Sequence, residues 1–317
     1  MKYLKLIRIQ NLLMLAFMQV LFRYTFLKTA TFTTLTSTNN FLALSHFQFF
    51  LLVLATVCIA AAGYVINDIV DQTTDEIAKK RIVGKTISES TAYNLYVALN
   101  LIGVGSGFYI SNVIQKPSFA ALFIFTAAIL YIYATWLKQI AIVGNIVVAL
   151  VLSFSILILG IFDLVPSTHE GNEIWEGNKV QMRRVFSILT DYAIFAFIIN
   201  FLRELVKDIE DTDADYASGI ATLPVLIGKS RTIKIVFGLS FLPIILLVLY
   251  MNNNLANYDY AIYYFLLFIV APLLFFTIKS WSAKTQKDFT NLSLLLKIIL
   301  FFGIISIAVI TYSVPNA

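Results

Sequence analysis

The residues best suited to chemistry in this sequence lie in a short acidic stretch that runs from Asn67 to Asp75. Asn67, Asp71 and Asp75 are four residues apart, so on a helix they share one face. Carboxylates at this spacing repel one another, and the repulsion destabilises the helix unless a cation lies between them. The spacing therefore predicts a site for a cation.

A second acidic stretch, Asp208–Asp215, repeats this pattern farther along the chain. Asp208, Asp211 and Asp215 follow one another at spacings of three and four residues, which also share a helix face. Mg²⁺ prefers oxygen ligands, keeps several waters, and is commonly shared between a few carboxylates and the phosphates of a substrate. The two acidic faces therefore predict magnesium ions that bridge to a diphosphate.

Basic residues flank both acidic stretches, and their charges suit the phosphates of the same ligand. Four come directly after the first stretch, two lie beside the second, and one lies in a third loop. They are Lys79, Lys80, Arg81 and Lys85, then Arg203 and Lys207, and finally Lys138.

The composition is that of a membrane protein. Of the 317 residues, 59% are hydrophobic and 13% are charged, whereas soluble proteins average roughly 25% charged residues. The net charge of +5 fits basic cytoplasmic loops, and we expect no nucleic-acid partner. The single cysteine, Cys58, lies in an apolar run, so disulfides play no part.

Charge-free runs long enough to cross a bilayer, about 17–25 residues, recur along the chain. We expect an all-α polytopic membrane protein with nine spanning helices in a single domain over residues 1–317. The acidic stretches close the second and sixth spans. The predicted spans are 9–27, 46–70, 91–113, 118–137, 139–163, 184–206, 233–252, 258–279 and 292–313.

The basic residues also predict the orientation. Most of the 23 Lys and Arg residues lie in the N-terminal tail and the loops after the even-numbered spans. The positive-inside rule therefore predicts that both acidic stretches face the cytoplasm, in an integral protein of the cell (inner) membrane. Arg23, at the far end of the first span, is expected to extend to the interface.

These groups together suit the ionisation of an allylic diphosphate. Metal coordination stabilises the diphosphate as it leaves, and the carbocation that remains needs a water-poor pocket where aromatic faces can stabilise it. The chain has 27 Phe and 16 Tyr residues, and its apolar helices suit a lipid tail.

The two acidic stretches also resemble known signatures. Asn67-Asp68-x-x-Asp71-x-x-x-Asp75 resembles the first signature, NDxxDxxxD, of the UbiA family of intramembrane prenyltransferases. The segment from Arg203 to Pro224, with its Lys-Asp-Ile-Glu-Asp run and its Thr-Leu-Pro end, resembles the second. The resemblance covers essentially the whole chain.

Membership of this family implies a UbiA-like helical bundle. It also implies Mg²⁺-dependent transfer of a polyprenyl group from its diphosphate to a lipophilic or amphiphilic acceptor. The expected partners are these two substrates and the surrounding membrane lipid. By this resemblance four aspartates are catalytic and bind magnesium, and Asn67 and Asp208 complete the metal site. The four are Asp71, Asp75, Asp211 and Asp215. Arg81 and Lys138 match positions associated with diphosphate binding, and Lys207 and Arg203 are neighbouring cations for the same ligand.

The second signature most resembles the branch of geranylgeranylglycerol-phosphate geranylgeranyltransferases. The segment Ala78–Ile82 departs from that branch, because it is shorter than the usual Asn-Lys-Pro-x-Arg-Pro-like segment and has no proline. This difference affects two inferences from the resemblance, namely the identity of the acceptor and the match of Arg81 to a diphosphate-binding position. Transfer to a quinone precursor, an aromatic acid or a naphthoate, therefore stays open.

Two other functions compete with prenyl transfer. An intramembrane terpene cyclase uses the same metal–diphosphate chemistry without a second substrate. An ion-coupled transporter also uses membrane acids, but its ions usually bind near the midplane in broken helices. Arg8 and Asn11, at the inner end of the first span, are candidates for contact with the acceptor head group, and an interfacial anchor is the simpler interpretation for both.

Overall fold

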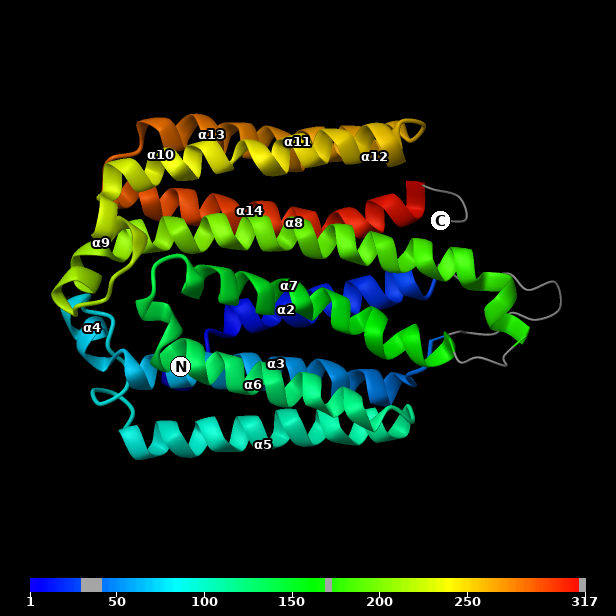
Figure 1. The fold of residues 1–317 in the computed structure, drawn as a ribbon, viewed down its shortest axis with the longest axis horizontal. Helices are drawn as coiled ribbons and strands as arrows, with labels where there is room; N and C mark the ends of the chain where they lie inside the picture. The colour runs from blue at the N-terminus through cyan, green and yellow to red at the C-terminus, as the bar shows by residue number, and fades with distance from the viewer. Residues whose placement is uncertain (30–41, 169–172, 314–317) are drawn as a thin grey trace. The chain divides into compact units, whose positions relative to one another are not determined.

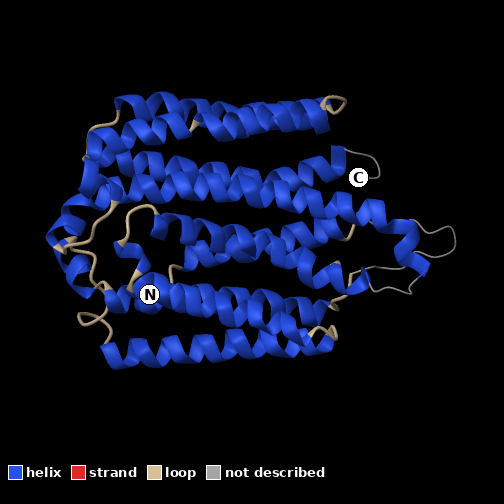
Figure 2. Ribbon diagram, in the orientation of Figure 1, coloured by secondary structure: helices blue, strands red, loops and turns tan. Residues whose placement is uncertain are grey.

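The computed structural model describes residues 1–29, 42–168 and 173–313, and for residues 167–168 and 173–181 only the backbone. The regular structure in these ranges is helical (Figure 2), and two isolated β-bridges join Val83 to Ile87 and Ile140 to Ala221. The predicted all-α fold is confirmed.

The described residues form two compact units, and Figure 1 labels the helices of the chain. The first unit comprises the described residues of Met1–Arg23, Thr31–Leu137 and Phe154–Tyr192. The second comprises those of Tyr24–Ala30, Lys138–Ser153 and Ala193–Ala317. The sequence-based expectation of a single domain over 1–317 stays a prediction.

The first unit contains six complete helices and parts of two more. The complete helices are α1 (Lys2–Leu6), α2 (Ile9–Leu21), α3 (His46–Val70), α4 (Gln72–Ile77), α5 (Glu89–Val113) and α6 (Ala120–Thr135). A π-helical turn, Phe22–Leu27, continues α2. The helices α7 (Val143–Asp163) and α8 (Glu173–Ala217) contribute residues to both units.

The second unit contains the helices that follow α8 in the chain. They are α9 (Leu223–Ile227), α10 (Lys229–Leu239), α11 (Phe241–Tyr250), α12 (Asp259–Phe265), α13 (Ala271–Ser282) and α14 (Gln286–Ser313). The π-helical turns Met251–Leu255 and Leu266–Val270 follow α11 and α12. Within this unit α13 packs against α10, α11 and α14.

Seven helical segments in the described ranges are long and apolar enough to span a membrane, so the chain is an integral membrane protein. They are His46–Val70, Pro117–Thr135, Val143–Asp163, Met182–Ala217, Lys229–Leu255, Asp259–Ser282 and Gln286–Ser313. All nine predicted spans fall on helical segments. Nevertheless, α5 and the 13-residue α2 are not among the seven, so nine spans stays a prediction.

The helix α8 corrects the predicted sixth span, 184–206. It has 45 residues and begins at Glu173, eleven residues before the predicted span. At a rise of about 1.5 Å per residue its length is roughly 68 Å, more than twice the ~30 Å hydrocarbon core. The helix continues beyond the predicted span, through the second acidic stretch to Ala217, which agrees with the helical spacing of its aspartates.

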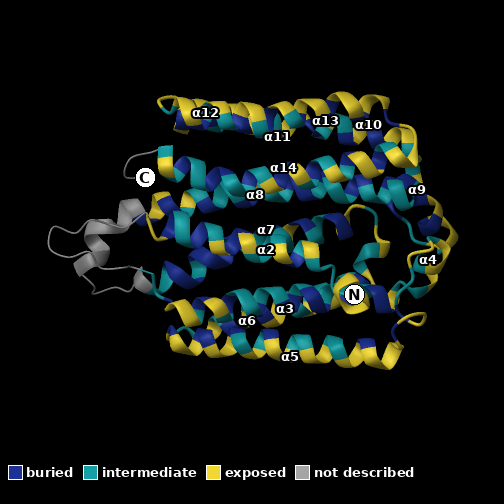
Figure 3. Ribbon diagram, turned by 180° about the vertical axis from the view of Figure 1, so that it is seen from behind, coloured by how far each residue is buried: buried dark blue, intermediate teal, exposed yellow. Residues whose placement is uncertain are grey.

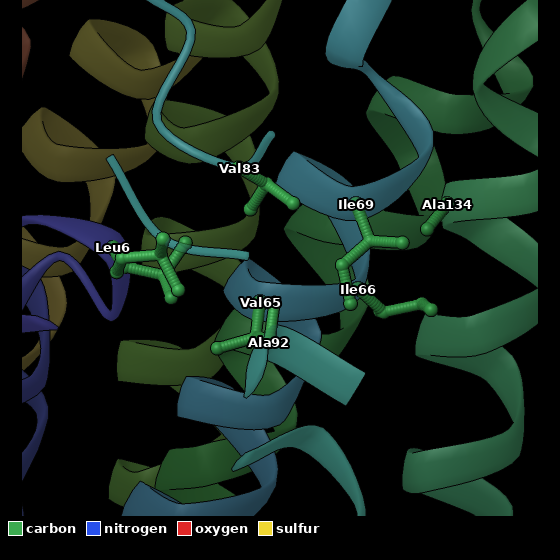
Figure 4. Packing of buried hydrophobic residues seen from close by; sticks show 8 residues of the cluster. Leu6, Val65, Ile66, Ile69, Val83, Ala92 and Ala134 are labelled. Atoms are coloured by element: carbon green, nitrogen blue, oxygen red, sulfur yellow. The ribbon is translucent and has the colours of Figure 1, made fainter. Parts of the chain in front are cut away.

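A buried apolar cluster holds the C-terminal end of α3 in the first unit (Figure 4). Val65, Ile66 and Ile69 of α3 pack there against residues from α1, α5, α6 and the loop after α4. Those partners are Leu6, Val83, Ile87, Ala92 and Ala134. Because these α3 residues are buried on both sides of Asn67 in the sequence, the cluster fixes the direction of the polar face of the helix end. Figure 3 shows buried and exposed positions alternating along the helices.

Arg23 does not extend to the interface as predicted. Its side chain is 3% exposed, and its Nε lies 2.8 Å from Oδ2 of the fully buried Asp163. Its guanidinium also donates to the carbonyl of Leu44 and lies over the Phe49 ring, 4.4 Å from its centroid. The Leu44 amide donates to Asp163 Oδ1 at 3.1 Å. Burial without pairing would be costly for either charge, so the ion pair replaces the predicted snorkelling.

Candidate metal and diphosphate site

The first acidic stretch lies where α3 ends and α4 begins. Asp71 forms the junction, with φ −83° and ψ 11°, so the acidic stretch extends over two helices. Asn67 Nδ2 donates to Asp71 Oδ2 at 2.7 Å, which confirms that these two side chains share a face. The backbone amide of Asp75 donates to the carbonyl of Asp71 at 2.8 Å. Asn67, Asp71 and Asp75 are all half-buried.

The neighbour of Asn67, Asp68, belongs to a different cluster. It is buried, and its Oδ1 lies 3.3 Å from Arg8 Nη2. The Arg8 guanidinium also lies over the ring of Tyr64, at 4.8 Å from its centroid, and Asn11 donates to the Tyr64 hydroxyl at 3.2 Å. The start of α2 thus contacts the C-terminal end of α3, which contains the first acidic stretch. Both residues predicted to contact the acceptor substrate, Arg8 and Asn11, lie in this cluster.

Arg81 is bonded to its own loop. Its Nη1 lies 2.6 Å from Glu76 Oε2, its Nη2 donates to Gln72 Oε1 at 3.0 Å, and its Nε donates to the Val83 carbonyl at 3.0 Å. The side chain ties α4 to the segment that follows it. A ligand that binds Arg81 must compete with the carboxylate of Glu76, which is 68% exposed.

The second acidic stretch is held by polar partners within the second unit. Asn145, near the start of α7, donates to Asp208 Oδ2 at 2.8 Å. Thr222 donates its hydroxyl to Oδ2 of the buried Asp215 at 3.2 Å. Asp211, between them on α8, is half-buried. These bonds orient two of the three predicted carboxylates.

The loop that contains Lys138 lies beside the loop that follows α8. An isolated β-bridge pairs Ile140 with Ala221, the residue before Thr222. Lys138 lies in a 3₁₀ turn, Leu137–Gln139, two residues before this bridge. The sequence predicted Lys138 as a diphosphate-binding residue, and the bridge brings its loop beside the loop that follows the second acidic stretch.

Two predicted diphosphate ligands lie on α8 before the acidic stretch. Both contact Glu204 Oε1, Arg203 through Nη1 at 3.2 Å and Lys207 through Nζ at 3.0 Å. Arg203 and Glu204 are only 15% and 13% exposed. The Nε of Arg203 is buried and has no hydrogen-bond partner among the residues that the structure describes. Two cations therefore share one carboxylate.

Within the described ranges, no three Asp, Glu, His or Cys side chains form a ready-made metal site. That finding excludes a compact all-protein cage for those residues. It fits Mg²⁺, which needs one or two carboxylates and completes its shell with water and substrate phosphates. The Asn67–Asp71 pair suits this role, because the amide donates its hydrogen and leaves the amide oxygen and a carboxylate oxygen as ligands.

Sequence reasoning assigned no role to Asp68, Asn145 or Thr222. Asp68 and Thr222 lie inside the two signature-like segments, so their position there was the available signal. Asn145 had none, because its partner Asp208 is 63 residues away and only the folded chain brings them together.

These features define a class of protein. It is a helical integral membrane protein with two acidic segments, each beside basic residues. A sequence profile of the UbiA prenyltransferase family matches residues 27–303. A digeranylgeranylglyceryl phosphate synthase from Korarchaeum cryptofilum is 31% identical over 251 residues, which cover 77% of this chain and 79% of that protein. This chain belongs to the UbiA prenyltransferase family.

Solved structures share the fold. A UbiA homologue from Aeropyrum pernix superposes with a TM-score of 0.64 at 19% identity, covering 93% of this chain and 97% of that one. A UbiA homologue from Archaeoglobus fulgidus, bound to DMAPP and Mg²⁺, superposes with a TM-score of 0.56 at 17% identity. The match covers 98% of this chain and all of the homologue.

Family membership confirms the predicted enzyme class, a prenyltransferase. The transporter interpretation is therefore wrong. The predicted roles of individual site residues stay predictions.

Proposed function

We propose that this protein is a Mg²⁺-dependent enzyme that transfers a polyprenyl group, such as geranylgeranyl, from its diphosphate to geranylgeranylglycerol phosphate. The observation that supports this acceptor is the similarity to a digeranylgeranylglyceryl phosphate synthase over 77% of the chain. The Mg²⁺-bound and DMAPP-bound UbiA homologue supports the metal and the kind of donor.

The proposed ligands of the magnesium–diphosphate unit come from both acidic stretches. They are Asn67, Asp71, Asp75, Asp208, Asp211 and Asp215, of which Asp71, Asp75, Asp211 and Asp215 are the catalytic residues. Magnesium, when bound, neutralises the diphosphate and stabilises it as a leaving group. Arg81, Lys138, Lys207 and Arg203 add positive charge around the same phosphates.

In the proposed reaction, the bond between C1 of the prenyl chain and the diphosphate oxygen breaks, and its electron pair leaves with the diphosphate. A hydroxyl oxygen of the acceptor then forms the new bond to C1, and the hydroxyl proton is released. The Asn67–Asp71, Asn145–Asp208 and Thr222–Asp215 hydrogen bonds hold the ligand oxygens in place before the substrate arrives.

Arg8 and Asn11 are the proposed contacts for the acceptor head group. Their bonds to Asp68 and Tyr64 place them beside the end of α3, next to Asn67. The Arg8 side chain is 39% exposed.

The experiment that tests this function uses purified protein in nanodiscs with Mg²⁺ and radiolabelled geranylgeranyl diphosphate. Parallel reactions offer geranylgeranylglycerol phosphate, an aromatic acid and a naphthoate. We expect labelled product with the glycerol phosphate. Product with an aromatic acceptor would instead assign the protein to quinone synthesis. A hydrocarbon formed without any acceptor would identify a cyclase.

Replacing Arg81 by alanine should weaken donor binding. We expect the KM for the prenyl diphosphate to rise about 10-fold, the effect of losing one charge-assisted hydrogen bond, while kcat changes less. Initial rates over a range of donor concentrations measure both constants. Glu76→Ala is the control, because it releases Arg81 from its loop partner and should not raise this KM. Unchanged constants in Arg81→Ala would remove Arg81 from the site.

We also propose that both acidic stretches face the cytoplasm of the cell membrane, as the distribution of basic residues suggests. Asp213 is the suitable reporter, since its side chain is 87% exposed. In a Cys58→Ala background, an impermeant maleimide should label Asp213→Cys in inverted vesicles and not in spheroplasts. Labelling in spheroplasts would reverse the orientation.

A further inference from the structure

A lysine that none of the sequence motifs includes lies among the apolar residues of α14. Lys297 is the only charged residue between Asp288 and the end of the chain, and it follows Leu294-Leu295-Leu296. An ionisable residue within an apolar membrane helix is costly, and such residues commonly mark a substrate or ion site. Its surroundings therefore need an explanation.

Contacts between α14 and the C-terminal half of α8 establish how the two helices are aligned. Thr290 of α14 donates to Glu210 Oε1 at 2.9 Å, and Gln286 donates to the Glu210 carbonyl at 3.3 Å. Farther along, the Phe195 ring lies beside Gly303. The residue numbers rise on one helix as they fall on the other, so the helices are antiparallel. Figures 1 and 3 show α14 running beside α8.

This alignment places Lys297 opposite Arg203. Lys297 is seven residues after Thr290, and Arg203 is seven residues before Glu210. Seven residues are two helical turns, about 10.5 Å along the axis, so both side chains return to the facing sides of their helices. The positive charge of Arg203 acts on Lys297 electrostatically, which agrees with this placement.

The resulting cluster contains Arg203 and Lys207, which both contact the carboxylate of Glu204, and Lys297 opposite Arg203. Two of its cations already share Glu204, and Arg203 keeps a buried Nε donor without a partner among the described residues. The next acid, Asp208, accepts a hydrogen bond from Asn145 and is also in electrostatic range of Lys207. Like charges gathered in a poorly hydrated place repel one another unless an anion joins them.

We propose that Arg203, Lys207 and Lys297 bind a phosphate group of a substrate, and that Lys297 on α14 is a binding residue of this site. The inference rests on the proposed function, because both of its substrates contain phosphate. The phosphate belongs either to the prenyl donor or to the glycerol phosphate acceptor. Arg203 lies eight residues, about 12 Å along α8, from Asp211. Lys207 lies between them, four residues from Asp211, so the cluster continues along α8 from the acidic stretch.

The test replaces Lys297 by methionine, which keeps the length of the side chain and removes the charge. Lys297→Arg keeps the charge, and Lys287→Met is the matched control at an exposed position of the same helix. The KM for geranylgeranyl diphosphate is measured at saturating acceptor, and the KM for geranylgeranylglycerol phosphate at saturating donor. Lys297→Gln replaces the methionine variant if that variant does not fold.

We expect Lys297→Met to raise one of the two KM values by about 10- to 100-fold, the cost of losing a charge-assisted bond to phosphate. Lys297→Arg should stay within a few-fold of the unmodified protein, and Lys287→Met should match it. A raised donor KM assigns the site to the diphosphate, and a raised acceptor KM assigns it to the acceptor phosphate. Two KM values within twofold of the unmodified protein would overturn the proposal.

Direct binding separates this inference from the proposed function. If the unmodified protein transfers no prenyl group to any acceptor, the proposed function fails. Binding of inorganic phosphate and pyrophosphate, followed by calorimetry, then tests the cluster alone. Weaker binding to Lys297→Met than to Lys287→Met would still support a phosphate site. Equal binding to both variants would overturn it.

Discussion

Asp71→Asn and Asp211→Asn should each lower kcat by at least about 100-fold. Residues behind metal ligands typically contribute 10- to 100-fold, and a direct ligand contributes more. Asparagine keeps the shape of the side chain and removes the negative charge that Mg²⁺ needs. Prenyl transfer from labelled geranylgeranyl diphosphate, measured over a range of Mg²⁺ concentrations, gives the rates.

Asp213→Asn is the matched control for this experiment. Asp213 lies on the same helix as Asp211, but its side chain is 87% exposed and pairs with Lys229 at 2.8 Å. Its replacement should leave kcat within about twofold, since exposed ion pairs contribute little. Near-normal rates in both Asp71→Asn and Asp211→Asn, with thermal unfolding unchanged, would refute the metal assignment.

Arg23→Met should destabilise the folded protein by about 3–5 kcal/mol, the usual cost of leaving one partner of a buried ion pair uncompensated. Asp163 is fully buried and would lose its guanidinium partner, and the Leu44 carbonyl would lose a donor. Thermal unfolding in detergent, followed by circular dichroism, should show a lower midpoint temperature. The substitution replaces none of the proposed site residues.

The double variant Arg23→Met/Asp163→Leu removes both charges and should recover most of the lost stability, because an apolar pair replaces the ion pair. Lys229→Met breaks the exposed pair with Asp213 and should cost no more than about 1 kcal/mol. If Arg23→Met unfolds at the same temperature as the unmodified protein, the buried pair does not stabilise the fold.

The sequence alone determined the membrane class, the helical segments and the family. Apolar runs separated by charged residues are local features, and each helix satisfies its own backbone in lipid, so α3 begins and ends at the predicted residues. The Asn67–Asp71 contact was predictable for the same reason, since four residues make about one helical turn.

Helix ends without an apolar boundary were harder to predict. The sequence placed the end of the sixth span at 206, within a charged segment that begins at Arg203, and α8 continues to Ala217. Charged residues at helical spacing do not stop a helix, and their partners Asn145 and Lys229 come from other parts of the chain. The spacing of the acids is a local pattern and predicts the continuation of α8, whereas the partners of the acids are not local.

Only the tertiary structure decided which distant groups meet. Arg23 and Asp163 are 140 residues apart, and the hydrophobicity around Arg23 predicted an interfacial side chain until the fold supplied a buried carboxylate. Lys297 lies among apolar residues in the sequence, and the alignment of α14 with α8 places it opposite Arg203. Sequence spacing determines which residues share a helix face, whereas the packing of one helix against another determines what that face meets.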